Sequence, residues 1–123
     1  MHWTNRSLDD FTFAVGCSFI RQVEKAMDAR GISQAQLAAM LGVTQSSVSQ
    51  TLGDPNNLTI KKLAHYARAL NLKIAVLLYD DGDGDNQDGP IDGEIFVRAW
   101  ESVGRPRDFF ALTEVGGGDN ACN

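Results

Sequence analysis

Residues 34–53 constrain the fold of this chain more than any other stretch. Their sequence, QAQLAAMLGVTQSSVSQTLG, has the apolar spacing of two short helices joined by a tight turn. Ala38 is small, so two helices can cross closely beside it, and Gly42 can adopt the positive φ that a sharp turn needs. The side chains predicted to face inward are apolar: Leu37, Leu41, Val48 and Leu52. The second helix carries no charged residue, whereas an ordinary exposed helix carries Glu and Lys.

The outer face of this predicted second helix has the chemistry of a surface that reads DNA. In a helix-turn-helix, the second helix lies in the major groove with its N-terminal residues at base edges. Glutamine can donate to and accept from adenine N6 and N7, and the helix lacks the Arg or Lys that makes the commonest guanine contact. We therefore predict that the directly read bases include A·T pairs. The candidate base-contacting residues are Gln45, Ser46, Ser49 and Gln50, of which Gln45 is the best placed.

Other polar residues near predicted helix starts are candidates for contacts to DNA phosphates. Lys61 and Lys62 fall in the first turn of a predicted helix, where the macrodipole disfavours cations, and this suggests an external anion. Free backbone N–H groups at the same helix start form a natural phosphate site. The predicted contacts to the DNA backbone are Gln34, Thr44, Asn56, Asn57, Thr59, Lys61 and Lys62. The simpler alternative for the two lysines is ordinary solvated charge.

Further helices flank the central pair. The first secure helix spans residues 17–30 and ends at Gly31, while residues 1–16 are ambiguous, although Ser7 and Asp10 can open a short helix there. Side chains suited to N-caps precede each later helix: Ser33 (with Gln36 as a capping box), Thr44 and Thr59. The last of these helices is predicted over residues 59–71, after a Gly/Pro/Asn-rich loop.

Residues 72–79, LKIAVLLY, predict a β-strand, with a buried helix extension as the alternative for so short an apolar run. A lone strand is unstable because its backbone donors and acceptors need partners, and no second strand is obvious in the sequence. We therefore expect two copies to pair through this segment as a homodimer. The predicted dimerisation residues are Leu72, Ile74, Val76 and Leu78. The alternative is pairing within the chain, with residues 1–6 or the C-terminal tail.

The net charge of −5 is unfavourable for DNA binding when taken over the whole chain, but the charge is unevenly distributed between two segments. Residues 18–79 contain seven basic and three acidic side chains, a net +4, whereas residues 80–123 contain three basic and eleven acidic ones, a net −8. Phosphate attraction depends on the local field and not on the whole-chain average. The asymmetry therefore favours a basic DNA-binding region followed by an acidic extension.

The C-terminal part divides into three segments by composition. Residues 80–93 are a Gly/Asp linker, residues 94–112 begin with an amphipathic helix, and residues 113–123 are predicted to be disordered. In the linker, Asp81, Asp83 and Asp85 match the first three ligand positions of a calcium loop. However, Asn86 stands in place of the required glycine, and Asp92 stands in place of the final glutamate. We therefore favour a flexible acidic spacer over a calcium site, and predict no bound metal.

Residues 18–79 resemble the phage-repressor (Cro/C1, XRE) family of helix-turn-helix regulators. The matching motifs are Ile20-Arg21, Gly31, Ser33-Gln34, Leu37-Ala38, Leu41-Gly42-Val43, Val48, Leu63-Ala64 and Ala69-Leu70. The resemblance implies dimeric operator binding and usually repression, base contacts at Gln45 and Ser46, and a phosphate contact at Gln34. A strand after the last helix further resembles antitoxin-type regulators. Asp54-Pro55 departs from the family pattern, because an acid there weakens phosphate attraction.

These patterns together predict a mainly α protein with a lambda-repressor-like helix-turn-helix domain, a following β-strand and a C-terminal amphipathic helix. The predicted organisation is an N-terminal extension (1–16), a DNA-binding domain (17–79) ending in the dimerisation strand (72–79), a linker (80–93), a helical segment (94–112) and a tail (113–123). The expected partners are double-stranded DNA with a palindromic operator, a second copy and, as a further candidate, a toxin protein.

Several function classes have little support in the sequence. It contains no Gly-rich phosphate loop, metal-spaced Cys/His cluster or nucleophile elbow, so we expect no catalytic residues and no cofactor. No apolar run reaches the length of a membrane span and no signal pattern begins the chain, which favours a cytoplasmic protein without membrane contact. The main alternative is an interaction module, or antitoxin, that binds a partner through the C-terminal aromatic residues Phe96, Trp100, Phe109 and Phe110.

Overall fold

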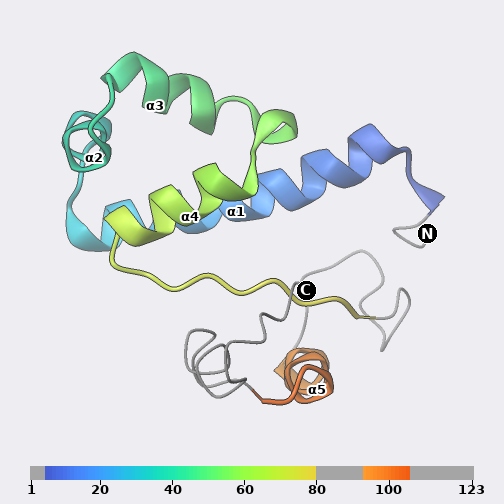
Figure 1. Ribbon diagram of the computed structural model, residues 1–123. Coiled ribbons are helices and arrows are strands. Elements are labelled where there is room, and N and C mark those ends of the chain that lie inside the picture. Colours follow the sequence, from blue (N-terminus) through green and yellow to red (C-terminus); the bar gives the residue numbers. More distant parts are fainter. Residues whose placement is uncertain (1–4, 80–92, 106–123) are drawn as a thin grey trace, which may run out of the picture. The chain divides into compact units, whose positions relative to one another are not determined.

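The computed structural model describes residues 5–79 and 93–105, and Figure 1 shows the path of the chain. By its internal contacts the chain divides into two units, Thr4–Val76 and a second unit of Met1–Trp3 and Leu77–Asn123. The first unit contains α1 (Leu8–Arg30), α2 (Gln34–Leu41), α3 (Gln45–Leu52), the short 3-10 helix η2 (Pro55–Asn57) and α4 (Ile60–Ala69). The second contains α5 (Gly93–Ser102). The fold is mainly α, as the sequence predicts.

Side-chain caps begin the central helices at the predicted residues. The Ser33 hydroxyl accepts a hydrogen bond from the Gln36 N–H at 3.1 Å, and the Gln36 side chain accepts one from the Ser33 N–H at 2.8 Å, which completes the capping box. Thr44 and Thr59 cap α3 and α4 in the same way, through their hydroxyl groups. Each such cap typically contributes about 1 kcal/mol. Gly42 ends α2 with a left-handed φ of 73°, as the turn requires.

The first helix is longer than the sequence predicts. The sequence predicts its first secure helix over residues 17–30, but α1 continues without a break through the ambiguous residues before it. Ser7 caps the start of α1, at the residue that the sequence indicates for a helix start. Glycine in a helix interior is destabilising by roughly 0.5–1 kcal/mol relative to alanine, so Gly16 weakens the local preference for one continuous helix. Gly16 is buried against the backbone of Pro55, in a close contact that a residue with a side chain would obstruct.

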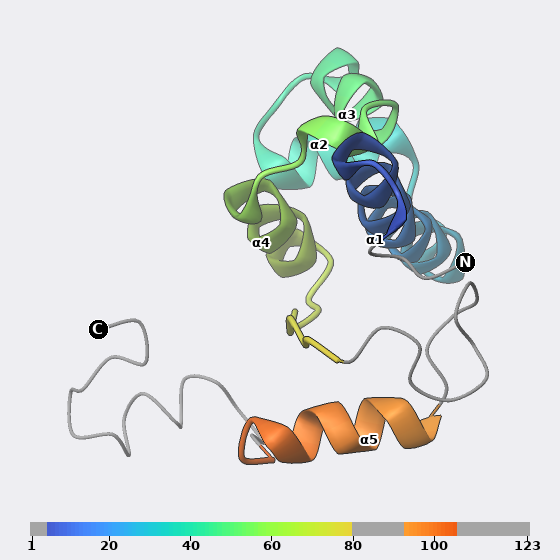
Figure 2. The same ribbon diagram turned by 90° about the vertical axis from the view of Figure 1, so that its right-hand side faces the viewer.

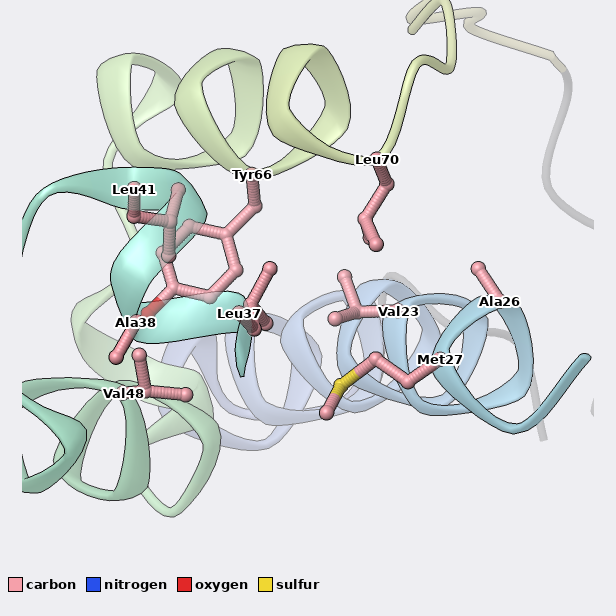
Figure 3. Packing of buried hydrophobic residues seen from close by; sticks show 9 residues of the cluster. All are labelled: Val23, Ala26, Met27, Leu37, Ala38, Leu41, Val48, Tyr66 and Leu70. Carbon is pink, nitrogen blue, oxygen red and sulfur yellow. The ribbon is translucent and has the colours of Figure 1, made fainter. Parts of the chain in front are cut away.

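The core of the first unit lies among α1, α2, α3 and α4 (Figure 3). Its buried members are Val23, Ala26, Met27, Leu37, Ala38, Leu41, Val48, Tyr66 and Leu70. Leu37 and Val48 are completely buried, and Figure 3 shows Tyr66 reaching from α4 toward the α2 side chains. Ala38 is buried where α2 packs against α3, as predicted. Figure 2 shows α2 and α3 together on one side of the unit formed with α1 and α4.

The predicted β-strand over residues 72–79 is not found in the single chain. None of the described residues is in a strand, and residues 72–79 have no regular secondary structure (Figure 1). Asn71 ends the preceding helical turn with a left-handed φ of 61°, and the chain then continues away from α4. A strand needs a partner for its backbone hydrogen bonds, and the described part of one chain supplies none.

Of the second unit, the structure describes Leu77–Tyr79 and residues 93–105. The amphipathic helix α5 begins at Gly93, one residue before the predicted start, and ends at Ser102. Ala99 is buried, whereas Phe96 is 48% exposed. The predicted spacer with its calcium-like aspartates, the aromatic pair Phe109 and Phe110, and the predicted tail lie outside the described residues.

Candidate DNA-binding surface

The helix α3 buries one face and presents the other outward. Val48 is fully buried and Thr51 is 6% exposed, and these residues are three apart, on one side of the helix. All four predicted base-contacting residues are exposed: Gln45, Ser46, Ser49 and Gln50. Figures 1 and 2 show α3 at the edge of its unit. The outward face is therefore an uncharged row of amides and hydroxyls.

The segment leading into α3 holds two of the predicted DNA backbone contacts. Gln34 occupies the first position of α2 and is half-buried. Thr44 is exposed, but its hydroxyl oxygen accepts a hydrogen bond from the Ser47 N–H at 3.1 Å. Neither α2 nor α3 contains a charged residue. Any positive charge that faces DNA near α3 must therefore come from another element.

The turn after α3 is held by side-chain hydrogen bonds. The Asn57 amide nitrogen donates to both carboxylate oxygens of Asp54, at 2.9 Å each. The Asn56 amide nitrogen donates to the backbone carbonyl of Asp9, in the first turn of α1, at 3.0 Å. Asp54, the acid that departs from the family pattern, thus has a structural partner in the turn itself. The two asparagines predicted to contact DNA phosphates are exposed, but both amides already bond within the protein.

A polar hollow connects α3 to the start of α4. Its lining residues are Ser47, Gln50, Thr51, Asp54, Asn57, Leu58 and Lys62. Lys62 thus borders the same hollow as Gln50 of the outward α3 face. Lys61 and Lys62 are exposed, and no ion pair of either lysine is found in the described part of the chain. Thr59 is also exposed, and its hydroxyl oxygen accepts the cap hydrogen bond from the Lys62 N–H at 3.1 Å.

The predicted dimerisation residues follow this surface in the sequence, and all four are exposed apolar residues. Leu72, Ile74, Val76 and Leu78 are 42%, 37%, 69% and 87% exposed. They alternate along the chain, which is the spacing of one face of a strand. Within one copy, Val76 and Leu78 are mostly uncovered, and Leu72 and Ile74 are partly exposed.

Some residues of this surface escape the sequence-based prediction. Ser47 and Thr51 border the hollow although they lie on the inner side of α3. The contact between Gly16 and Pro55, which supports the turn from behind, was also missed. An isolated glycine inside a helical pattern indicates close packing, but it does not indicate which residue packs there.

The described residues hold no group of three or more His, Cys, Asp or Glu side chains arranged to bind a metal ion. Among the helices described, none has both the length and the hydropathy needed to cross a membrane.

Comparison with protein families identifies the helix pair. Residues 23–77 match a helix-turn-helix family. This segment is a Cro/C1-type (XRE) helix-turn-helix domain. The family binds DNA and is not enzymatic, so the domain implies sequence-specific DNA binding in transcription regulation. The resemblance drawn from the sequence is confirmed over these residues.

The matched segment covers only part of the described structure. It begins within α1, at Val23, and ends at Leu77, so the first two thirds of α1 and the whole of α5 lie outside it. Searches of curated proteins and of solved structures returned no significant match.

Proposed function

We propose that the chain is a dimeric repressor that binds a two-fold-related DNA operator with α3 in the major groove. The observation that carries the proposal is the uncharged polar face of α3, fully outward while Val48 on its other side is fully buried. A merely solvated helix would not need to exclude Glu and Lys. A base-reading helix benefits from amides and hydroxyls, which pair with base edges.

The proposed base contacts come from Gln45, Ser46, Ser49 and Gln50. Gln45 is the first residue of α3, where a recognition helix approaches the base edges. An amide can bond adenine N6 and N7 together, which is worth about 1–3 kcal/mol of discrimination against a wrong base. A serine hydroxyl serves several bases, so the two glutamines are expected to set most of the sequence preference.

The proposed DNA backbone contacts come from the ends of the neighbouring helices. Lys62 borders the hollow beside Gln50, and Lys61 is exposed next to it, so both can neutralise phosphates that flank the bases read by α3. The neutral contacts are proposed for Gln34, Thr44, Asn56, Asn57 and Thr59. With two lysines per protomer in this set, the affinity should fall with salt by a slope of about −0.9 for each phosphate neutralised.

The proposed dimer forms through residues 72–79. The exposed side chains of Leu72, Ile74, Val76 and Leu78 give each copy one apolar face over this segment. Antiparallel pairing of the two backbones would supply the missing strand partner, and the two apolar faces would then lie side by side. The variant Val76→Asp should dissociate the dimer, whereas Ala75→Asp, on the alternate side of the segment, should weaken it less. Analytical ultracentrifugation at micromolar concentration measures both, and a monomeric wild type contradicts this part of the proposal.

The experiment that tests DNA reading is selection of binding sites from random duplex DNA. Wild type should enrich a palindromic motif with half-sites about one helical turn, roughly 34 Å, apart. Gln45→Ala should lose or relax the preference at one position in each half-site. Gln22→Ala, an exposed glutamine of α1, is the matched control and should keep the wild-type motif. Weak binding without any enriched sequence contradicts the proposal.

A second candidate function is an antitoxin or interaction module that binds a partner protein through the C-terminal segment. It is favoured by the apolar surface of α5, where Phe96 is 48% and Val97 is 45% exposed. Truncation after residue 79 separates the two functions. A truncated chain that folds and still binds the selected operator supports a separate docking element, whereas loss of folding indicates that the C-terminal segment packs on the domain.

A further inference from the structure

We propose that the N-terminal half of α1 is a positioning element for DNA binding, because it fixes the turn η2 and, through that turn, Lys62. The inference rests on the proposed function of α3 and its neighbours as the DNA-binding surface. It adds a part of the chain, Leu8 to Gln22, that the matched family segment does not include. We call the contacts of Asp9 and Gly16 with Pro55 and Asn56 the α1–η2 brace.

The first contact of the brace joins two backbones. A Cβ atom added to Gly16 would lie 2.0 Å from the Pro55 carbonyl oxygen and 2.8 Å from its carbonyl carbon. Any side chain at this position would therefore overlap atoms that cannot rotate away. Since glycine is a poor helix residue, its place in the middle of a 23-residue helix is explained by this approach of η2.

The second contact is the hydrogen bond from the Asn56 amide to the Asp9 carbonyl, at 3.0 Å. Asp9 lies about two helical turns, roughly 10 Å along the axis, before Gly16. The turn is thus attached to α1 at two separated points. Two separated points restrict rotation of the turn as well as its translation.

The turn η2 also connects α3 to Lys62. The Asp54 N–H donates to the Thr51 carbonyl of α3 at 3.2 Å, and the Asp54 carboxylate accepts from Asn57. Asn57, Gln50 and Lys62 border one hollow. A displacement of η2 would therefore change the separation between the base-reading face of α3 and the ammonium group of Lys62. The brace holds that separation without touching DNA itself.

Ethylation interference on the operator selected by the wild-type full chain tests this role. Lys62→Ala identifies the phosphates that Lys62 contacts, because ethylation there should no longer interfere. Gly16→Ala should lose interference at these same phosphates, and Asn56→Ala should lose it there and at any phosphate that Asn56 itself contacts. Both variants should bind about threefold to tenfold more weakly, while the enriched base motif is retained. Val15→Ala, an exposed neighbour of Gly16 on α1, should keep the wild-type pattern.

Two results would overturn the inference. In the first, folded Gly16→Ala or Asn56→Ala keeps the wild-type interference pattern and affinity. In the second, folded Gly16→Ala loses interference only at phosphates that Lys62→Ala retains, which would mean that the turn does not act through Lys62. If Gly16→Ala does not fold, Asn56→Ala decides, because its side chain is exposed.

The brace can also be measured without DNA, which separates its failure from failure of the proposed function. In ¹H–¹⁵N spectra of the free chain, Gly16→Ala should shift the amide signals of Asp54 to Lys62 while those of α2 stay in place. If these signals do not move, the brace does not position the turn. If they move but the wild type selects no DNA sequence, the proposed function fails and the structural contact stands.

Discussion

The packing of Gly16 against Pro55 leads to a stability prediction with competing terms. Gly16→Ala gains roughly 1 kcal/mol from helix propensity, because alanine is the better helix residue. Against this, the new Cβ would lie 2.0 Å from the Pro55 carbonyl oxygen, about 1 Å closer than real Cβ atoms approach any heavy atom. Since the obstructing atom belongs to the backbone, either α1 or η2 must move.

Overpacking of this kind typically costs about 1–3 kcal/mol. Because the backbone shift would also strain the Asn56 hydrogen bond to Asp9, we expect a cost near the upper end of that range. The expected net effect is a loss of about 2 kcal/mol. For a unit of this size, each kcal/mol lowers Tm by about 4–8 °C, so Tm should fall by roughly 10 °C.

Urea unfolding followed by circular dichroism measures this free energy, and Val15→Ala serves as the control. Val15 is 54% exposed on the same helix, so its replacement by alanine should change the free energy of unfolding by less than about 0.5 kcal/mol. An increase in the stability of Gly16→Ala would refute the reasoning, because propensity alone would then describe the position and no close contact with η2 would exist.

Three further predictions concern the helix pair. Leu37→Ala should lower the free energy of unfolding by about 2–5 kcal/mol, because Leu37 is completely buried; a loss below 1 kcal/mol in urea unfolding would contradict the core described here. Ser33→Ala should cost about 1 kcal/mol by removing the capping box, whereas Ser49→Ala, exposed in mid-helix, should cost almost nothing in the same assay. Gly42→Ala should cost about 1–2 kcal/mol because its φ of 73° is left-handed and no neighbour compensates; an unchanged Tm in calorimetry would count against the turn geometry.

The features that the sequence predicts correctly depend on residues close together in the chain. The capping box joins Ser33 to Gln36, three residues later, and Gly42 ends α2 in the left-handed conformation. The period of 3.6 residues places Val48 inward and Gln45 outward. Such rules act within one or two helical turns, so they can be applied without knowledge of the fold. They were sufficient to indicate the helix-turn-helix and its outward polar face.

The β-strand prediction for residues 72–79 shows that a local sequence pattern is not sufficient to predict a strand. The apolar alternation of Ile74 and Val76 is present, and both side chains are exposed in one chain. Strand formation depends on a hydrogen-bonding partner, and alternation alone does not specify one. The pattern therefore identifies exposed apolar side chains but not the strand that would pair with this segment.

The sequence by itself determined the helix pair, its caps and the uncharged outer face of α3, because these follow from backbone propensity and periodicity over a few residues. Only the tertiary structure decided that the helix capped by Ser7 continues through Gly16 to Arg30 as one α1 and that its first half contacts the turn after α3. Asn56 and Asp9 are 47 residues apart, and no local rule relates residues at that distance. Their contact exists because folding of the core brings η2 onto α1, where Gly16 leaves room for a backbone.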